Sequence, residues 1–230
     1  MWVYLIASSI LYFLLFVREL TVPTSITPWI IAVIACFVWA LALLPYFKSV
    51  KLTEVSQRAP LGKISLILLL AMSVAFLGEK LTLQKLSGTL LVVAGAVVLV
   101  FSKGRLKIHT GIKITLLSAF LSSIALILDK IAVSYFTPAI YGFLTYLLPA
   151  LFITPLVLNK KAEMESVIKR RRKTLLGLAL VGTIGYFSLL TALQLTEASN
   201  VFPITQLSAV IAVLGGYFFH KEKDIWRRLL

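Results

Sequence analysis

The sequence predicts an all-α integral membrane protein, and three observations support this fold class. Of the 230 residues, 60% are hydrophobic and 14% are charged, whereas soluble domains average about 45–50% apolar and about 25% charged residues. The mean hydropathy is +0.98. The apolar residues form long runs, and 20 of the 23 Lys and Arg residues lie in short polar gaps between them. A soluble globule of this length cannot bury so much apolar surface, which excludes a soluble enzyme and a disordered tail.

Eight apolar runs are long enough to cross a bilayer, whose core of about 30 Å requires roughly 17–25 residues per helix. In chain order they are 1–17, 28–47, 52–76, 81–101, 113–135, 138–158, 174–193 and 198–219. Each run must be helical, because lipid offers no hydrogen-bond partner to an open backbone. None alternates with the period of two expected for barrel strands. A polar stub follows the last run, and a short apolar segment after it resembles the start of a further helix.

The Lys and Arg residues are distributed unequally between alternate gaps. One set of gaps holds 17 of them, and the opposite set holds only Arg18, Lys80 and Lys85. By the positive-inside rule the richer set is cytoplasmic, so we expect a multi-pass protein of the cytoplasmic membrane with both ends of this chain in the cytoplasm. The basic run Lys169–Lys173 then anchors the topology or binds anionic lipid. The net charge of +14 therefore indicates membrane lipid as a partner, and no nucleic acid.

Two segments of the chain are similar in sequence. Residues 51–87 match residues 194–230 without a gap, at an offset of 143 and with ten identities. The identities least expected by chance are Glu54 with Glu197, Pro60 with Pro203, and Glu79-Lys80 with Glu222-Lys223. The repeat unit contains five spans, an odd number, so successive copies enter the membrane from opposite sides. Inverted repeats are typical of secondary transporters, which bind substrate near the midplane at the repeat interface.

The same segments resemble a known family. Phe76-Leu77-Gly78-Glu79-Lys80-Leu81-Thr82, continuing through Gly88 to the Val-rich helix with Gly95, resembles the end of an EamA domain. Leu193-Gln194-Leu195-Thr196-Glu197-Ala198-Ser199, followed by Pro203, resembles the entry to the fourth helix of such a domain. The EamA domain is the repeat unit of the drug/metabolite transporter superfamily.

The resemblance implies a ten-helix fold built from two five-helix repeats, and the exchange or export of small metabolites. On this alignment residues 1–102 form the first repeat without its first helix, residues 103–112 form a basic cytoplasmic linker, and residues 113–230 form the second repeat without its last helix. Gly88 and Gly95 share one helix face, which suits packing within the chain or, as in small multidrug-resistance relatives, a homodimer.

Ionisable residues inside membrane spans are candidates for function. Lys63 lies near the middle of its span, and Pro60, three residues earlier, points to the same side of a helix. The repeat positions equivalent to these two are Gln206 and Pro203. A Lys and a Gln facing each other across a pseudo-two-fold axis favour a carboxylate or phosphate substrate. The alternative is that Lys63 is buried against an acidic partner or extends to the interface.

Charged residues nearer the span ends have two interpretations each. Glu54 and Arg58 are spaced i, i+4 and form either a salt bridge at the cytoplasmic mouth or part of a gate that also contacts substrate. Glu197 occupies the equivalent position at the outer mouth. Asp129 is a carboxylate for a proton or a substrate, or it anchors the helix at the interface together with Lys130.

Aromatic residues provide flat surface for a substrate pocket. We expect Trp39, Tyr146 and Tyr186 to line such a pocket, whereas Tyr46 and Tyr141 lie close enough to span ends to belong to the interfacial aromatic belt.

We therefore predict a secondary transporter that moves small metabolites, amino acids or drug-like compounds by alternating access between inverted repeats. Its expected partners are a small-molecule substrate and membrane lipid. No cofactor or metal is expected, because the chain has two His and the single Cys36. It has no Gly-rich phosphate loop for ATP and no cluster of catalytic residues, so we do not expect an enzyme. The alternative is a truncated, non-transporting fragment or a membrane interaction subunit.

Overall fold

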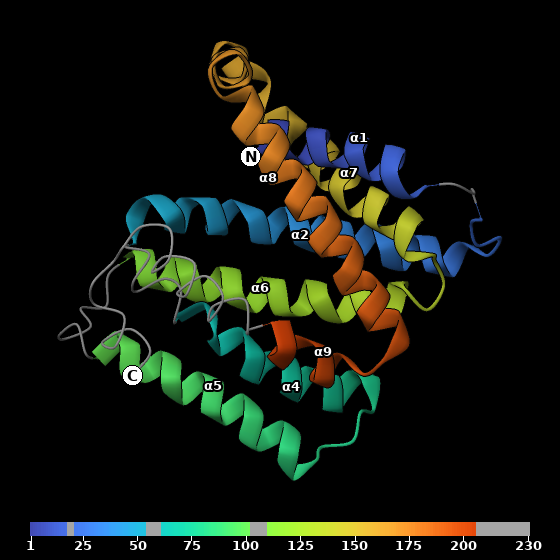
Figure 1. The fold of residues 1–230 in the computed structure, drawn as a ribbon, viewed down its shortest axis with the longest axis vertical. Coiled ribbons are helices and arrows are strands. Elements are labelled where there is room, and N and C mark those ends of the chain that lie inside the picture. The colour runs from blue at the N-terminus through green and yellow to red at the C-terminus, as the bar shows by residue number, and fades with distance from the viewer. Residues whose placement is uncertain (18–20, 54–60, 102–109, 206–230) are drawn as a thin grey trace. The chain divides into compact units, whose positions relative to one another are not determined.

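The computed structural model describes residues 1–17, 21–53, 61–101 and 110–205, and this part of the chain is helical without a strand. Figure 1 shows the arrangement of the helices. In chain order they are α1 (Trp2–Phe16), α2 (Ile26–Leu52), α4 (Ile64–Leu77), α5 (Leu83–Phe101), α6 (Thr110–Ala132), α7 (Pro138–Val157), the 3-10 turn η1 (Leu158–Lys160), α8 (Lys161–Leu195) and α9 (Ala198–Thr205).

Four helices in the described ranges are long and apolar enough to cross a membrane: α2, α6, α7 and the Ile168–Leu195 part of α8. Apolar helices α1 and α4, and the Leu83–Gly95 part of α5, are shorter. The all-helical membrane class is thus confirmed, while the count of eight spans stays a prediction. Large apolar side chains such as Leu14, Leu91 and Val181 are more than 70% exposed, as expected for helices whose outer faces meet lipid rather than water.

The helices form two compact units, each assembled from both halves of the sequence. Unit 1 comprises Met1–Leu44 and Ile124–Thr196, and unit 2 comprises Pro45–Ser123 and Glu197–Leu230. The predicted repeats 1–102 and 113–230 therefore each contribute helices to both units. Pro45 stands inside α2 at the boundary, where a proline removes one backbone hydrogen bond of the helix.

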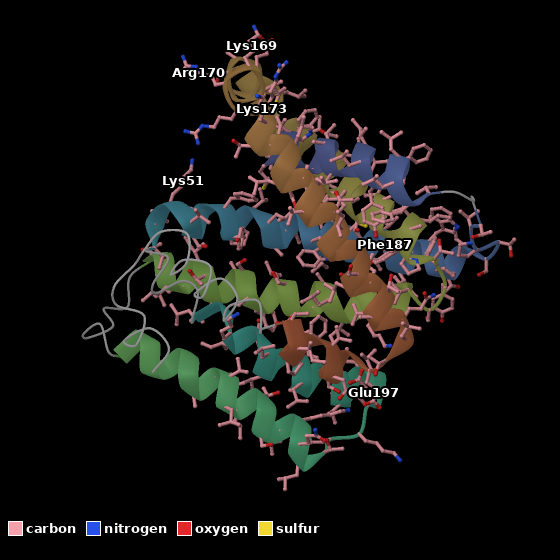
Figure 2. All side chains as sticks on the ribbon, viewed as in Figure 1. Lys51, Lys169, Arg170, Lys173, Phe187 and Glu197 are labelled. Carbon is pink, nitrogen blue, oxygen red and sulfur yellow. The ribbon has the colours of Figure 1, made fainter. Side chains whose placement is uncertain are left out.

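The core of unit 1 is built where α1 packs against α7 and α8 (Figure 1). Tyr12 is fully buried there, and its hydroxyl donates to the Pro138 carbonyl at 2.9 Å. Phe16 stacks on Phe187, which Figure 2 labels on α8, with ring centroids 4.0 Å apart. Aromatic contacts of this kind hold α1 against the two longer helices.

Gly142 provides the space that the Tyr12 ring occupies. A Cβ atom at Gly142 would lie 2.0 Å from Cζ of Tyr12, far inside van der Waals contact. We expect Gly142→Ala to destabilise the protein by about 1–3 kcal/mol, the usual cost of overpacking a core. Gly185→Ala is the matched control, because nothing lies within 4 Å of its added Cβ. Thermal unfolding in detergent measures both, and equal melting temperatures would contradict the close packing of Tyr12 on α7.

Helix α8 begins earlier than the predicted span 174–193. It starts at Lys161 and continues through the basic run, with non-helical backbone angles at Arg171 (φ −129°, ψ 25°) that mark a kink. Lys169, Arg170 and Lys173 extend from this end of α8 in Figure 2 and are exposed. Outside a bilayer a polar segment can continue as a helix because water solvates its side chains, and Glu165 supports it with an i, i+4 pair to Lys169 at 3.8 Å.

In unit 2, α4 packs against α5 and α9. Helix α4 ends at Gly78, which has the left-handed angles φ 66° and ψ 21° that favour glycine. The backbone N–H groups of Gly78 and Glu79 close the turn by donating to the Ser73 carbonyl, the Glu79 N–H at 3.2 Å. This turn directs Glu79 toward α9.

Candidate functional site

The most distinctive site in unit 1 is built around the carboxylate of Asp129, in the last turn of α6, which is 0% exposed. Trp39 Nε1–H from α2 donates to both oxygens, at 3.1 Å to Oδ1 and 3.0 Å to Oδ2. The Tyr141 hydroxyl from α7 lies 2.6 Å from Oδ1, and the Tyr186 hydroxyl from α8 lies 2.8 Å from Oδ2. Four helices therefore converge on one carboxylate.

An indole N–H can only donate a hydrogen bond, so its position between the two oxygens favours an ionised acceptor. No Lys, Arg or His of the described ranges forms an ion pair with Asp129. A buried charge normally has a paired charge or several hydrogen bonds. Here neutral donors alone fulfil that role, so the carboxylate is hydrogen-bonded but not neutralised by a cation within the described ranges.

A pocket of about 170 Å³ lies beside this carboxylate, and we call it the aromatic pocket. It is lined by Tyr4, Leu5, Trp39, Leu43, Thr145, Tyr146 and Tyr186. Two of these, Trp39 and Tyr186, are also donors to Asp129. They connect the pocket to the carboxylate, so a molecule in the pocket would lie one side chain away from the charge.

The structure brings together four residues that the sequence singled out: Trp39, Asp129, Tyr146 and Tyr186. Sequence reasoning favoured the interfacial belt for Tyr141, but it is 0% exposed and donates to Asp129. The available signal was that Tyr141 follows Asp129 by 12 residues across a short connection between two helices. Two helices joined by a short turn pack side by side, so early residues of the second helix meet late residues of the first.

Lys130, next to Asp129, points to a different neighbour. Its ammonium group donates to the carbonyl oxygens of Leu193 and Thr196, the latter at 2.7 Å, at the end of α8. The last carbonyls of a helix lack intrahelical donors, and a cation there also matches the helix dipole. Lys130 therefore caps α8 rather than contacting the Asp129 carboxylate.

We expect Lys130→Met to cost about 1–2 kcal/mol of stability, because it leaves these two carbonyls without their charged donor. Lys130→Arg should recover most of the loss, since a guanidinium also carries donors and charge. Chemical unfolding of the detergent-solubilised variants measures the difference. A Met variant as stable as the Arg variant would contradict the capping role.

The other predicted site residues fall in unit 2 or outside the described residues. Lys63 is half-buried at the N-terminus of α4, and Pro203 lies inside α9. Glu54, Arg58, Pro60 and Gln206 lie outside the described ranges, so the pairing of Lys63 with Gln206 stays a prediction. A small cavity of about 160 Å³ near this region is lined mainly by serines and a threonine, including Ser49, Ser65 and Thr115.

Glu79 joins α9 to the turn after α4. Its side chain accepts hydrogen bonds from the backbone N–H groups of Ala198 (2.7 Å) and Ser199 (2.9 Å), and from the Ser199 hydroxyl. Its place at the end of an apolar run is typical of a solvated residue, but Glu79 is 8% exposed and caps α9. Burial raises its pKa, but the hydrogen bonds from Ser199 and Ala198 and the charge of Lys85 outweigh burial, so its pKa lies below the ordinary value.

Glu197, which Figure 2 labels, lies directly before α9 and forms an ion pair with Lys85 of α5. The role of Glu197 at an outer mouth stays a prediction. Together with the hydrogen bonds of Glu79, this ion pair holds the 79–85 segment and the start of α9 together at two points. The charge count predicts that both segments lie outside. No group of three or more metal-ligating side chains occurs within the described ranges.

A family model described as the EamA-like transporter family matches residues 1–101 and 109–230. A protein of Archaeoglobus fulgidus named "Uncharacterized transporter" is 26% identical over 184 residues, which cover 80% of this chain and 64% of that protein. A Sinorhizobium protein named "Uncharacterized transporter in cobO 3'region" is 34% identical over 71 residues, covering 31% of this chain and 50% of that protein. The matched regions thus span less than two thirds of these relatives.

Proposed function

The chain belongs to the EamA-like transporter family, as its sequence resemblance predicted, and on this premise we propose that it is a secondary carrier. It moves small metabolites, amino acids or drug-like compounds across the cytoplasmic membrane by alternating access. Both similar proteins carry the name transporter, and helices of membrane-spanning length support the same function.

The observation that carries the proposal is the Asp129 carboxylate beside the aromatic pocket. An ionisable group on a membrane-length helix is costly and is a functional hypothesis by default. Asp129 is held by residues from α2, α7 and α8. Protonation of Asp129, or substrate binding beside it, therefore acts on several helices at once. Such a group can bias a two-state equilibrium between inward-open and outward-open forms, because substrate or a proton interacts differently with each form.

In this mechanism substrate enters the aromatic pocket and contacts the side chains of Trp39 and Tyr186. Because both side chains donate to Asp129, a shift of either one changes how α6 is held. Release of the substrate on the opposite side of the membrane returns these side chains to their substrate-free positions. Coupling to protons through Asp129, Glu54 or Glu197 is part of the proposal.

Counterflow in proteoliposomes tests the function. Vesicles loaded with a panel of unlabelled amino acids, amines and organic acids should accumulate the labelled form of at least one of them. Asp129→Asn should abolish this exchange, whereas Glu165→Gln, an exposed carboxylate on the polar part of α8, should not alter it. A folded wild-type protein that exchanges no compound would contradict the carrier assignment, and full exchange by Asp129→Asn would contradict the site.

Lys63 is a second proposed position for substrate, favouring anions together with Gln206, Pro60 and Pro203. Lys63→Ala should then weaken exchange of organic acids selectively. If exchange of every compound in the panel is unchanged, Lys63 has no part in the substrate path.

The membrane orientation is a further proposal and is tested by single cysteines. Cys36 is buried, so reagents should reach mainly introduced thiols. Lys51→Cys and Lys80→Cys, both at exposed positions, should react with an impermeant maleimide from opposite sides of the membrane. Labelling of both from the same side would contradict the predicted sidedness.

A further inference from the structure

Four of the seven residues that line the aromatic pocket carry rings: Tyr4, Trp39, Tyr146 and Tyr186. Tyr146 meets Tyr4 edge to face at a centroid distance of 6.2 Å and meets Tyr186 edge to face at 5.6 Å. Because the ring planes cross at 75°, the faces of these rings point in different directions around the pocket lining. The face of an aromatic ring is its electronegative side, so a group of such faces attracts a cation.

Four of the five side-chain donors that line the pocket are directed at protein acceptors. The Tyr146 hydroxyl donates to the Gly182 carbonyl at 3.1 Å, and the Thr145 hydroxyl donates to the Gly142 carbonyl at 2.9 Å. Trp39 and Tyr186 donate to Asp129. An anion in the pocket would find these four donors engaged, and an anion needs donors to replace its hydration shell.

The charge nearest the pocket is negative. Asp129 lies behind Trp39 and Tyr186 and has no ion-pair partner in the described part of the chain. The neighbouring ammonium group of Lys130 is committed to the carbonyls at the end of α8. A carboxylate in a site with little water exerts a stronger field than the same group in solution. The pocket is therefore favourable for positive charge on two independent grounds, its rings and its field.

We propose that the aromatic pocket binds a small organic ammonium cation, with the π faces around the cation and Asp129 supplying the opposing charge. This inference rests on the carrier function proposed above and adds its substrate class. The pocket volume of about 170 Å³ restricts the ligand to a compact cation. An alkylammonium group suits the site better than a metal ion, because it binds aromatic faces without requiring oxygen ligands.

Choline is a suitable probe, because 3,3-dimethyl-1-butanol has nearly the same shape without the charge. Binding to the purified wild-type protein is measured by isothermal titration calorimetry in detergent at pH 7.5. We expect choline to bind about tenfold or more tightly than the neutral alcohol, as cation–π and charge terms of ordinary size imply. The anion 3,3-dimethylbutanoate should not bind detectably.

The variants separate the two sources of affinity. Tyr146→Leu should weaken choline binding about tenfold and leave the weak binding of the alcohol nearly unchanged, while Tyr146→Phe, which keeps the ring, should retain more affinity than Tyr146→Leu. Asp129→Asn should weaken choline binding to a similar or greater extent. Tyr135→Leu is the matched control, because Tyr135 is 53% exposed and lies outside the pocket. The Tyr146 series keeps the test decisive if Asp129→Asn does not fold.

Choline binding no tighter than the alcohol, or an equal loss in Tyr135→Leu and Tyr146→Leu, would overturn the proposal. Counterflow distinguishes its failure from failure of the carrier function. If the protein exchanges another compound and choline does not compete, the cation assignment is wrong and the carrier function stands. If choline binds with the expected variant pattern but no compound is exchanged, the cation site stands and the carrier function is wrong.

Discussion

Replacing Asp129 with alanine is expected to destabilise unit 1 by about 3–5 kcal/mol, the largest effect of any single substitution considered for this protein. The carboxylate accepts from Trp39, Tyr141 and Tyr186, and its removal leaves three donors without an acceptor. Each buried donor left unsatisfied costs roughly 1–3 kcal/mol. Relief of the buried charge offsets part of that sum, since a desolvated carboxylate is itself unfavourable.

Two further variants give reference values for the loss of stability in Asp129→Ala. Tyr186→Phe removes one hydrogen bond together with its donor, so it should cost only about 1 kcal/mol. Glu165→Ala, at an exposed carboxylate, should stay within about 0.5 kcal/mol of the wild type. Reversible unfolding in mixed micelles ranks the three variants. If Asp129→Ala is as stable as Glu165→Ala, the hydrogen bonds to Asp129 do not hold the four helices together.

Glu79 should give the second large effect, and this effect depends on pH. Glu79→Ala leaves two backbone N–H groups of α9 and the Ser199 hydroxyl without their acceptor, at a cost of about 2–4 kcal/mol. The pKa of Glu79 is lower in the folded protein than its ordinary value of 4.5. The stabilisation is therefore fully present above pH 4.5 and is lost as the pH falls through the lower pKa of the folded state.

The measurement compares wild-type protein with Glu79→Gln across the acid range. Glutamine keeps one acceptor oxygen but does not titrate, so the stability difference between the two proteins should be constant at neutral pH and shrink below the ordinary glutamate pKa. Lys85 and Glu197 are the charged groups near this contact, and Glu197→Gln reports how far their ion pair contributes. A difference that grows as the pH falls would contradict the assignment, because it would require a raised pKa.

Membrane class, helix positions and family were accessible from the sequence. The predicted span 138–158 agrees with α7 (Pro138–Val157), and 113–135 overlaps α6 (Thr110–Ala132). These predictions succeed because hydropathy is a sum over neighbouring residues, and the bilayer selects segments by that sum. The extent of α8 was not accessible in the same way, because its polar first turns are helical without being apolar.

The candidate site was only partly predictable. An aspartate inside an apolar run is conspicuous, and Trp39, Tyr146 and Tyr186 were plausible pocket residues. That Trp39 and Tyr186 both reach the Asp129 carboxylate depends on how four helices rotate about their axes and pack. Tyr141 shows the limit: its position near a span end suggested the interfacial belt, whereas the packing of α7 against α6 buries it against Asp129.

The sequence by itself thus determined that the chain is a helical membrane protein of the EamA-like family. Composition and short motifs depend only on residues that are near one another in the sequence. Only the tertiary structure decided that Glu79 caps a helix 119 residues away and that Trp39 reaches a carboxylate 90 residues away. Contacts over such distances depend on side-chain packing between helices, and apolar helix faces of similar composition permit many alternative packings.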